Sequence, residues 1–284
     1  MMDQPQRADL HIHTTASDGT LTPSELVARA AEAGLAAVAI TDHDTVAGWD
    51  EALGAGEREG VRVVPGIEVS SSIRGRSLHL LGYFPDRDHP ALKALLERMQ
   101  EARQKRIGEI LHKLHDLGIP LEEEDLQREI KEGQPGRMHV ARALAARGVV
   151  ERPEEAFARY LSRGRPAYVP KPDLPAREVL QALKAAGAVT VWAHPGTFGD
   201  DGVLPELLEA GLDGIEVLHP DHGPKDVERY RRLAEAHGLL MSGGTDFHSP
   251  KERVPLGSLW VTVEVIGEIL QRKKDLQSSV LKKP

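Results

Sequence analysis

Short apolar runs alternate with amphipathic helical patterns along most of the chain. The run at residues 8–12 is followed by a helical pattern over 22–34, with Thr22 as a candidate N-cap and Pro23 in the first helical position. Further runs of strand length lie at 36–41, 61–69, 78–82, 188–194, 214–218, 239–242 and 259–263. Strands that alternate with helices are typical of βα units, so the pattern predicts an α/β fold with a parallel sheet.

The pattern changes between the runs at 78–82 and 188–194. Residues 92–170 are charged and helix-forming, and no strand-like run appears before Val189. We therefore predict a small helical insertion at 92–170 within a discontinuous main domain of residues 1–91 and 171–284. Most charged positions of the insertion are interpreted as solvent-exposed helix faces.

Composition limits the chemistry that the chain can carry. The 284 residues include no cysteine, which excludes disulfides, thiolate zinc sites and cysteine nucleophiles and leaves His, Asp and Glu as metal ligands. A net charge of −8 and 4% aromatic residues argue against an extended surface for nucleic acid, double-stranded or single-stranded. No run reaches membrane-spanning length and no secretion signal is visible, so we expect a cytoplasmic protein with no membrane partner.

Histidine and carboxylate side chains lie within or directly after most of the apolar runs. His11 and His13 are two residues apart on an extended segment and therefore point to the same side of it. In an α/β barrel, side chains at the C-terminal strand ends gather on one face. Any one of them could be an ordinary core histidine, but so many at one rim would repel or lack partners unless cations held them. The candidates are His11, His13, His43, Glu68, His79, His194, Asp246 and His248.

The motifs around these residues resemble, in order, those of the PHP (polymerase and histidinol phosphatase) phosphoesterases. The resemblance covers residues 8–82 and 188–250 and implies an α/β fold that is a distorted (β/α)7 barrel. It also implies two to three divalent metal ions, with Mn2+ favoured and Fe2+ or Zn2+ as alternatives. The matching motifs are Asp9-Leu-His11-Ile-His13, Thr41-Asp-His43, Gly66-Ile-Glu68, His79, Ala193-His194-Pro and Thr245-Asp246-Phe-His248.

The resemblance also implies how the ligands are shared among the metals. A first metal would be held by His11, His13, Glu68 and Asp246, and a second by Asp18, His43 and His248. Glu68 would bridge to a third metal bound by His79 and His194. The residues implied in catalysis are His11, His13, Glu68, Asp246 and His248.

Several aspartates near these ligands have more than one interpretation. Asp18 is a ligand in the resemblance but could be an ordinary turn residue beside Gly19. Asp9 and Asp42 are interpreted as orienting ligands or capping strand ends. Asp44 or Thr45 is a candidate N-cap for the helix after the run at 36–41.

A second motif lies in the insertion. Gly136-Arg-Met-His-Val-Ala-Arg-Ala-Leu144 resembles the inserted domain of the PHP branch that acts on nucleoside 3′,5′-bisphosphates and RNA 5′ ends. The free N–H groups of a helix start attract anions, so Arg137 and His139 are expected to hold a phosphate that is not cleaved. The alternative is an ordinary helix start with exposed basic residues. His222 is a further candidate for substrate contact. The leaving group could be protonated by His222 or by a metal-bound water, and the sequence does not choose between His222 and His219.

The function expected from these features is metal-dependent hydrolysis of nucleotide phosphate esters. Nucleoside 3′,5′-bisphosphates and short RNA with a 5′ phosphate are the favoured substrates, with a substrate-binding role for the insertion. A histidinol-phosphate-type phosphatase and a non-catalytic, metal-binding PHP module are the alternatives. The lack of a fused polymerase and the apparent completeness of the ligand set argue against the non-catalytic module.

Overall fold

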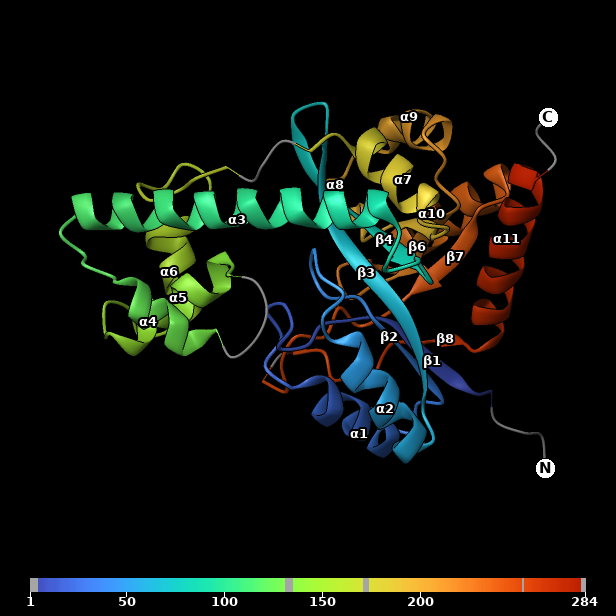
Figure 1. The fold of residues 1–284 in the computed structure, drawn as a ribbon, viewed down its shortest axis with the longest axis horizontal. Helices are drawn as coiled ribbons and strands as arrows, with labels where there is room; N and C mark the ends of the chain where they lie inside the picture. Colours follow the sequence, from blue (N-terminus) through green and yellow to red (C-terminus); the bar gives the residue numbers. More distant parts are fainter. Residues whose placement is uncertain (1–4, 131–134, 171–173, 252, 282–284) are drawn as a thin grey trace.

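The computed structural model describes residues 5–130, 135–170, 174–251 and 253–281, and its strands form one curled sheet (Figure 1). The order across the sheet is β7-β6-β5-β4-β3-β2-β1-β8. The α/β class is confirmed, and the sheet has eight strands where the resemblance implied seven. The strands are β1 (Arg7–Ile12), β2 (Ala37–Ile40), β3 (Arg62–Ile73), β4 (Arg76–Tyr83), β5 (Val189–Trp192), β6 (Gly214–Leu218), β7 (Leu240–Gly243) and β8 (Val261–Thr262).

The sheet is mixed, which corrects the prediction of a parallel one. β4 is antiparallel to both β3 and β5, and β8 is antiparallel to β1. β3 and β4 form a hairpin closed by Arg74 and Gly75, whose φ angles of 51° and 71° are those of a tight two-residue turn. A turn this short reverses the chain within the sheet, so no crossover helix separates these two strands.

The sheet closes into a barrel where the segment after β7 meets β1. The Asp246 N–H donates to the carbonyl of His11 (2.8 Å), and the His13 N–H donates to the carbonyl of Phe247 (2.9 Å). The first strand of the chain and a segment near its C-terminal end therefore lie side by side. The same contact brings together two stretches that carry candidate ligands.

Helices pack around this barrel on several apolar clusters. One cluster joins the first two helices to β1 and β2, and another joins the helices before and after β5 and β6 to β3–β6. Thr22 caps the first helix through the Glu25 N–H, as its sequence predicted. The helices around the barrel are α1 (Pro23–Glu32), α2 (Trp49–Glu59), α7 (Ala176–Ala185), α8 (Pro195–Phe198), α9 (Leu204–Glu209), α10 (Pro224–His237) and α11 (Glu264–Leu281), with a 3-10 turn η2 (Asp201–Val203).

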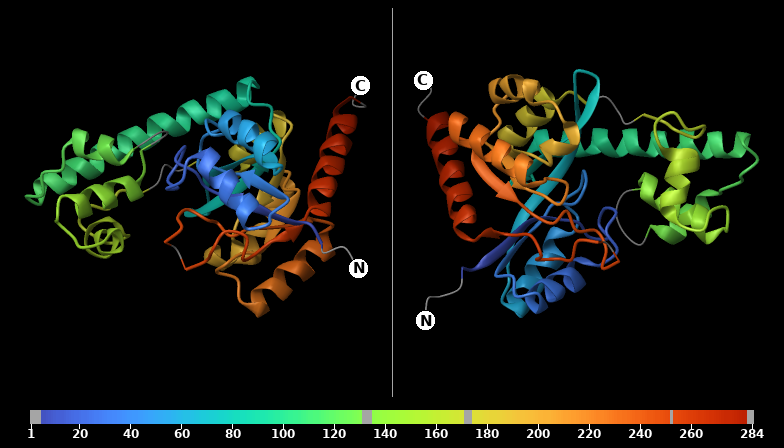
Figure 2. Two further views of the ribbon diagram at one scale, coloured as in Figure 1. Left: turned by 90° about the horizontal axis from the view of Figure 1, so that it is seen from below. Right: turned by 180° about the vertical axis from the view of Figure 1, so that it is seen from behind.

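A long helix, α3 (Pro90–Asp116), runs from the barrel into the insertion (Figures 1 and 2). Its first half packs in the barrel core, and its second half packs in a separate apolar cluster drawn from residues 107–169. The insertion also contains α4 (Glu123–Glu129), α5 (Arg137–Ala146), α6 (Pro153–Ala156) and a π-helical turn η1 (Phe157–Leu161).

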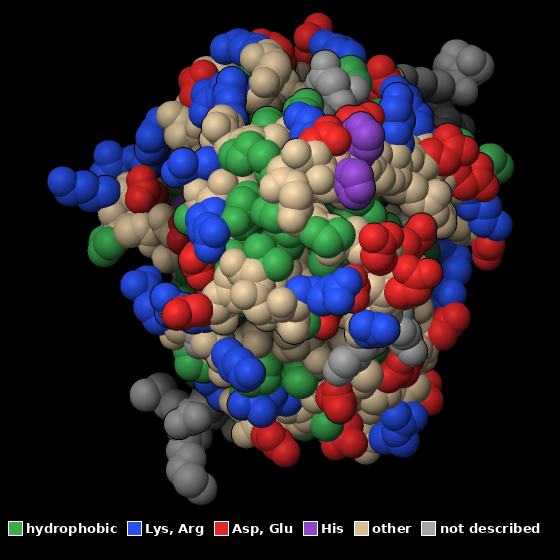
Figure 3. Space-filling model, turned by 90° about the vertical axis from the view of Figure 1, so that its left-hand side faces the viewer, with side chains coloured by type: hydrophobic (Ala, Val, Ile, Leu, Met, Phe, Trp, Pro, Cys, Tyr) green, Lys and Arg blue, Asp and Glu red, His purple; other side chains and the backbone are tan. Residues whose placement is uncertain are grey.

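The outer face of the insertion is mixed in character. Figure 3 views the molecule from this end and shows hydrophobic side chains near the centre with charged side chains of both signs around them. Leu117, 45% exposed, is the one large hydrophobic side chain classed as exposed among the described residues. No described helix has the length and apolar character needed to cross a bilayer.

Candidate metal centre

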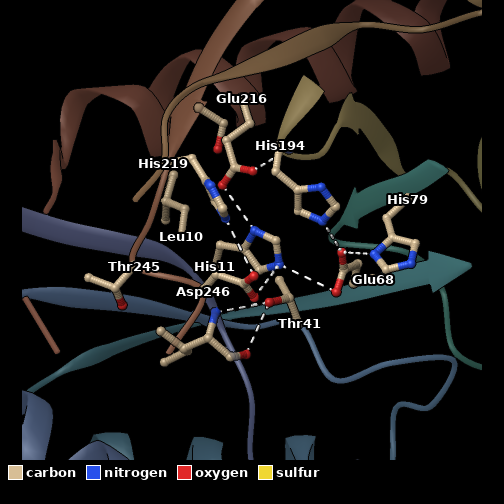
Figure 4. A network of polar contacts seen from close by, with 12 residues as sticks. Leu10, His11, Thr41, Glu68, His79, His194, Glu216, His219, Thr245 and Asp246 are labelled. Carbon is tan, nitrogen blue, oxygen red and sulfur yellow. Dashed lines mark hydrogen bonds and ion pairs between the residues drawn. The ribbon is translucent and has the colours of Figure 1, made fainter. Parts of the chain in front are cut away.

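The structure brings all nine candidate ligands to one mouth of the barrel. They come from the ends of β1, β2, β5 and β7 and from the middle of the β3–β4 hairpin (Figure 4 shows part of the cluster). The hairpin extends past the rim, which is why its two ligands are not at strand ends. The ligands are His11, His13, Asp18, His43, Glu68, His79, His194, Asp246 and His248.

One group consists of His11, His13, Glu68 and Asp246. The Nε2 atom of His13 is 3.0 Å from Asp246 Oδ1 and 3.3 Å from Glu68 Oε2, and that of His11 is 3.3 and 3.4 Å from the same atoms. Ligands that share a cation at about 2.1 Å lie about 3.0 to 3.4 Å apart in octahedral or tetrahedral geometry. The spacing of these atoms therefore fits a shared metal ion.

A second group contains His13, Asp18, His43 and His248, whose candidate ligand atoms lie within 4.8 Å of one another. Asp18 Oδ1 is 3.3 Å from His248 Nε2, so this aspartate faces the cluster rather than serving only as a turn residue. The rings of His13 and His248 are stacked with centroids 4.1 Å apart. His13 adjoins both groups, whereas the resemblance assigned it to the first metal alone.

Glu68 also faces a third group. Its Oε1 atom is 2.6 Å from His79 Nδ1 and 2.9 Å from His194 Nε2, while Oε2 is 2.9 Å from His43 Nδ1. The two carboxylate oxygens thus point to different sets of imidazoles. This is the arrangement that a bridging carboxylate needs.

Many of the polar atoms in this centre are buried and have no hydrogen-bond partner in the described part of the chain. They include His11 Nε2, both ring nitrogens of His13, Asp18 Oδ1, Glu68 Oε2 and Asp246 Oδ1. Buried polar atoms are nearly always paired, because each unpaired one loses its hydration without compensation. Cations placed among these atoms would supply the missing partners, so the donor set fits divalent metals.

The pKa values of the buried carboxylates are lowered by the imidazoles around them. Burial alone would raise the pKa of Glu68, but the nearby charges of His43 and His79 hold it well below its usual range. Asp246 behaves in the same way, with its pKa held well below normal by His11 and His248 against the effect of burial. These carboxylates therefore remain ionised in the buried site and can ligate cations.

Glu216 is a member of the site that the sequence interpretation missed. It is fully buried on β6, where Oε1 is 2.9 Å from His11 Nδ1 and Oε2 accepts the His194 N–H at 2.6 Å. A carboxylate on Nδ1 fixes the His11 tautomer so that Nε2 presents a lone pair to the cluster. The signal was present, because Glu216 interrupts an apolar run as Glu68 does.

Two aspartates hold the loops that carry the ligands. Asp9 accepts the Thr245 N–H at 3.0 Å, next to Asp246, and burial raises the pKa of Asp9 to about 6. Asp42 accepts the Thr14 N–H (2.7 Å) and the Ser17 hydroxyl (2.6 Å), which fixes the loop leading to Asp18. These contacts agree with the orienting role expected for both residues.

Asp44 differs from its expected role. The next helix, α2, has Gly48 at its N-cap without a side-chain hydrogen bond, so neither Asp44 nor Thr45 caps it. Asp44 instead turns back toward β3, where Oδ1 accepts the Ser70 N–H at 2.8 Å. The intervening residues separate it from the helix start.

Two of the ligand positions have a strained backbone. His194 has φ = 31° and Asp246 has φ = 50°, values in the left-handed region that residues other than glycine rarely adopt. Such conformations persist only where surrounding contacts hold them, and they concentrate at functional sites. Here they aim two side chains back into the barrel mouth.

The expected substrate contacts in the insertion differ from each other. His139 is 3% exposed, its Nδ1 accepts the Gly136 N–H at 3.0 Å, and burial lowers the pKa of His139 to about 4. The ring is therefore neutral and caps α5, so it offers no positive charge to a phosphate. Arg137 is half-buried and has no carboxylate partner among the described residues; its NH1 lies 3.4 Å from the Leu161 carbonyl.

His222 lies outside the groups of candidate metal ligands, and its expected contact with substrate stays a prediction. Its Nδ1–H donates to the Val217 carbonyl (2.9 Å), and its Nε2 accepts the Gly196 N–H (3.0 Å). Both ring nitrogens are used by the backbone. His219 lies closer to the centre, because its Nε2 is 3.4 Å from Asp246 Oδ2. Its Nδ1 accepts the Asp221 N–H at 3.1 Å.

Known proteins match this chain over nearly its whole length. The sequence profile of the PHP domain family matches residues 9–142. A 5′-3′ exoribonuclease of Haemophilus influenzae is 35% identical over 257 residues, which cover 89% of this chain and 93% of that protein. The chain belongs to the PHP family. The resemblance drawn from its motifs is confirmed.

Other relatives of this PHP protein carry different activities in their names. It is 36% identical to the 3′,5′-nucleoside bisphosphate phosphatase of Chromobacterium violaceum over 250 residues, which cover 86% of this chain and 88% of that protein. It is also 36% identical to the phosphoribosyl 1,2-cyclic phosphate 1,2-diphosphodiesterase of Eggerthella lenta over 257 residues, covering 87% and 96%. All three activities act on phosphate esters.

Solved structures agree with the PHP assignment. A crystal structure from Bifidobacterium adolescentis, described as a metal-dependent phosphoesterase, superposes with a TM-score of 0.89 at 36% identity and covers 95% of this chain and 98% of that one. A Chromobacterium violaceum protein described as an amidohydrolase with bound sulfate gives a TM-score of 0.83 at 33% identity, covering 94% and 96%. The similarity therefore includes the insertion as well as the PHP barrel.

Proposed function

We propose that this protein is a metal-dependent phosphoesterase that hydrolyses phosphate esters of nucleotides. The observation that carries the proposal is the set of buried, unpartnered imidazole and carboxylate atoms spaced 3.0–3.4 Å apart around His13 and Glu68. The names of the relatives, an exoribonuclease and a bisphosphate phosphatase among them, support the substrate class.

The three groups of ligands would hold two to three divalent ions. The first would use His11, His13, Glu68 and Asp246; the second Asp18, His43 and His248 with His13 beside them; the third Glu68, His79 and His194. Nitrogen and oxygen donors without sulfur suit Mn2+, with Fe2+ and Zn2+ as alternatives. Bound there, the ions would activate water and neutralise the charge of the phosphate.

The protein's own side chains would prepare and finish the reaction. Glu216 and Asp9 hold the ligands in place, so little reorganisation accompanies phosphate binding. His219 is the best-placed hydrogen-bond donor to the leaving oxygen, since its Nδ1 accepts a backbone N–H and its Nε2 therefore carries the ring hydrogen. It lines a hollow of about 390 Å³ together with Asp246, His248 and Arg253.

The insertion would bind the part of the substrate that is not cleaved. A cavity of about 170 Å³ separates it from the barrel and is lined by Thr15, Gly19, Thr20, Arg128, Glu129, His139 and Arg142. Arg137 is the remaining candidate for holding a second phosphate, because its charge has no carboxylate partner among the described residues. A nucleoside 3′,5′-bisphosphate, or RNA with a 5′ phosphate, would place one phosphate at the metal centre and a second phosphate at the insertion.

A phosphate-release screen tests the function directly. The Mn2+-loaded protein should release phosphate or mononucleotide from adenosine 3′,5′-bisphosphate or a 5′-phosphorylated trinucleotide faster than from histidinol phosphate or a ribose 1,2-cyclic phosphate. Asp246→Asn serves as the control, because it weakens the first metal group. Activity that persists in metal-free protein, or a lack of activity on every substrate with Mn2+, Fe2+ and Zn2+, would contradict the proposal.

A further inference from the structure

One charged residue interrupts the buried stripe of α3. Apolar side chains recur at spacings of three or four residues, and the step between the barrel half and the insertion half is occupied by Arg103. Its side chain is only 18% exposed. An apolar residue there would continue the packing at little cost, so a buried arginine needs another explanation. The apolar members of the stripe are Leu92, Leu95, Met99, Ile107, Ile110 and Leu114.

Arg103 pairs with Asp44, the residue that directly follows the candidate ligand His43. The Arg103 Nε donates to Asp44 Oδ2 at 2.7 Å, and a terminal nitrogen of the same guanidinium donates to the same oxygen. The Asp44 carboxylate is 1% exposed, and the Arg103 charge holds the pKa of Asp44 below its usual value against the effect of burial. The two charges therefore form a buried ion pair.

Asp44 is itself fastened to the strand that carries Glu68. Its N–H donates to the Glu68 carbonyl at 2.9 Å, and its carboxylate accepts the Ser70 N–H at 2.8 Å. The backbone is in the left-handed region at Asp44 (φ = 54°), which a non-glycine residue adopts only where contacts hold it. Asp44 is therefore held by the backbone of β3 itself, and it offers Arg103 a fixed anchor beside the metal-binding loop.

The same arginine also reaches the start of α5. Its NH1 atom is 3.6 Å from the position that a Cβ on Gly136 would occupy, beside the helix start that carries Arg137. A second contact between the two parts joins Arg142 of α5 to the carbonyl of Asp18 at 3.0 Å. Arg103 thus stands between the metal-binding loops and the helix start proposed to bind the second phosphate.

We propose that the buried Arg103–Asp44 pair fixes the position of the insertion relative to the metal centre, so that a substrate with two phosphates reaches both at once. The pair is a positioning device for substrate selection and not part of the chemical step. Replacing a buried ion pair by apolar residues often leaves stability unchanged, whereas a planar guanidinium on a carboxylate specifies orientation. The inference about substrates rests on the proposed function.

The position of the insertion can be measured without reference to activity. The chain has no cysteine, so Glu57→Cys on α2 and Glu154→Cys on α6, both at exposed positions, give a unique pair of spin-label sites. In this background Arg103→Met should shift or broaden the distance distribution between the labels. Arg98→Met is the matched control, because Arg98 also links α3 to α7 through an exposed pair with Glu178 at 2.8 Å, and it should leave the distribution unchanged.

Kinetics then separate positioning from support of the metal site. Arg103→Met should lower kcat/KM for adenosine 3′,5′-bisphosphate by about 10- to 100-fold, since a displacement of about 1 Å between two binding points is this costly. Turnover of p-nitrophenyl phosphate, which has one phosphate, should change by less than about twofold, as for a surface substitution, and metal content should stay the same. Arg103→Lys should recover part of the loss, because it restores the charge without the planar contact.

Asp44→Asn provides a second route if Arg103→Met does not fold. It keeps an oxygen for the Ser70 N–H, removes the charge, and should reproduce both effects. An unchanged label distance in both variants, or equal losses on the two substrates with loss of metal, would overturn the proposal. If the unmodified protein hydrolyses no phosphate ester, the proposed function fails while the label distances still decide whether the pair positions the insertion.

Discussion

Glu68 occupies the centre of the candidate site because its two oxygens serve different groups of histidines. Oε2 lies 2.9–3.4 Å from nitrogens of His11, His13 and His43, and Oε1 lies 2.6 and 2.9 Å from those of His79 and His194. Glu216, by contrast, contacts the Nδ1 atom of His11 and the backbone N–H of His194, so it supports two ligands from behind. The two buried glutamates therefore make different predictions.

Glu68→Gln should remove metal and activity together. The amide keeps the volume of the side chain but replaces one ligand oxygen by an NH2 group, which cannot ligate a cation. We expect turnover to fall by more than about 100-fold, since loss of a mere orienting partner already costs 10- to 100-fold. Elemental analysis should show fewer divalent ions per chain than in the unmodified protein.

Glu216→Gln is the comparison for this variant. It keeps an acceptor for His11 or His194 and should cost less metal and less activity than Glu68→Gln. Equal losses in the two variants would show that Glu68 orients ligands and does not bridge them.

The meeting of the candidate ligands could be predicted from the sequence, whereas the partners of some neighbouring histidines could not. His11, His43 and His194 stand at the ends of apolar runs, and such runs end on one face of a barrel, so their meeting could be predicted. The partners of His222 and His139 are backbone groups of Val217, Gly196 and Gly136. Backbone partners leave no trace in a pattern of side chains, so the sequence could not show that these two histidines bond to the backbone, and their expected contact with substrate stays a prediction.

At the scale of elements, the segment after β7 has little space where it closes the barrel. A Cβ on Gly244 would lie 2.4 Å from the backbone nitrogen of His11 and 2.6 Å from Asp9 Oδ1. Both neighbours are held in place, one by the β1 backbone and the other by Thr245. Any side chain at this position must push β1 away from the ligand segment that follows.

Gly244→Ala should therefore destabilise the protein and reduce metal binding. Overpacking of this kind costs about 1–3 kcal/mol, which corresponds to a fall in Tm of at least about 2 °C in a scanning calorimeter. Gly267→Ala in α11 is the control, because its Cβ would have no atom within 4 Å and alanine favours the helix. An equal fall in Tm for both variants would show that the lack of space at Gly244 is not the cause of the destabilisation.

Helices were predicted better than the strand order. The start of α1 could be predicted because its signals are local. The Thr22 side chain caps the helix by a hydrogen bond, and the ring of Pro23 fixes its own φ angle at a helical value. The antiparallel hairpin was missed because the run at 78–82 resembles any other buried strand. Arg74 and Gly75 form a tight turn because β3 and β4 pair on either side of them. Arginine is not a residue type that predicts such a turn from sequence.

At the scale of the molecule, the ligand set joins segments that are distant in the chain. The metal centre draws on strands from β1 to β7, so ions bound there would cross-link both halves of the barrel around the insertion. A ligand that binds only the folded state raises stability in proportion to the logarithm of its concentration above Kd. The insertion core, which contributes no candidate ligand, gains nothing directly.

Removal of metal should consequently lower the Tm of the protein. At about 100 times Kd, one ion contributes about 2.7 kcal/mol, so we expect chelator to lower Tm by about 5–10 °C and added Mn2+ to restore it. The chelator effect should shrink in Glu68→Gln, which has fewer ions to lose. A Tm that is the same with chelator and with Mn2+ would contradict the presence of the metals in the folded barrel.

The closure of the barrel by the segment around Asp246 also affects how activity arises during synthesis. On the ribosome, His11, His13, His43, Glu68 and His79 are made first, and the insertion core can then fold from contacts within residues 107–169. Asp246 and His248 emerge much later, and β8 must still arrive to pair with β1. A nascent or truncated chain that ends before residue 246 therefore carries most of the ligands without the pair that completes the centre. Under the proposed function, hydrolysis would begin only when the barrel has closed, and we expect a chain that ends before residue 246 to be inactive.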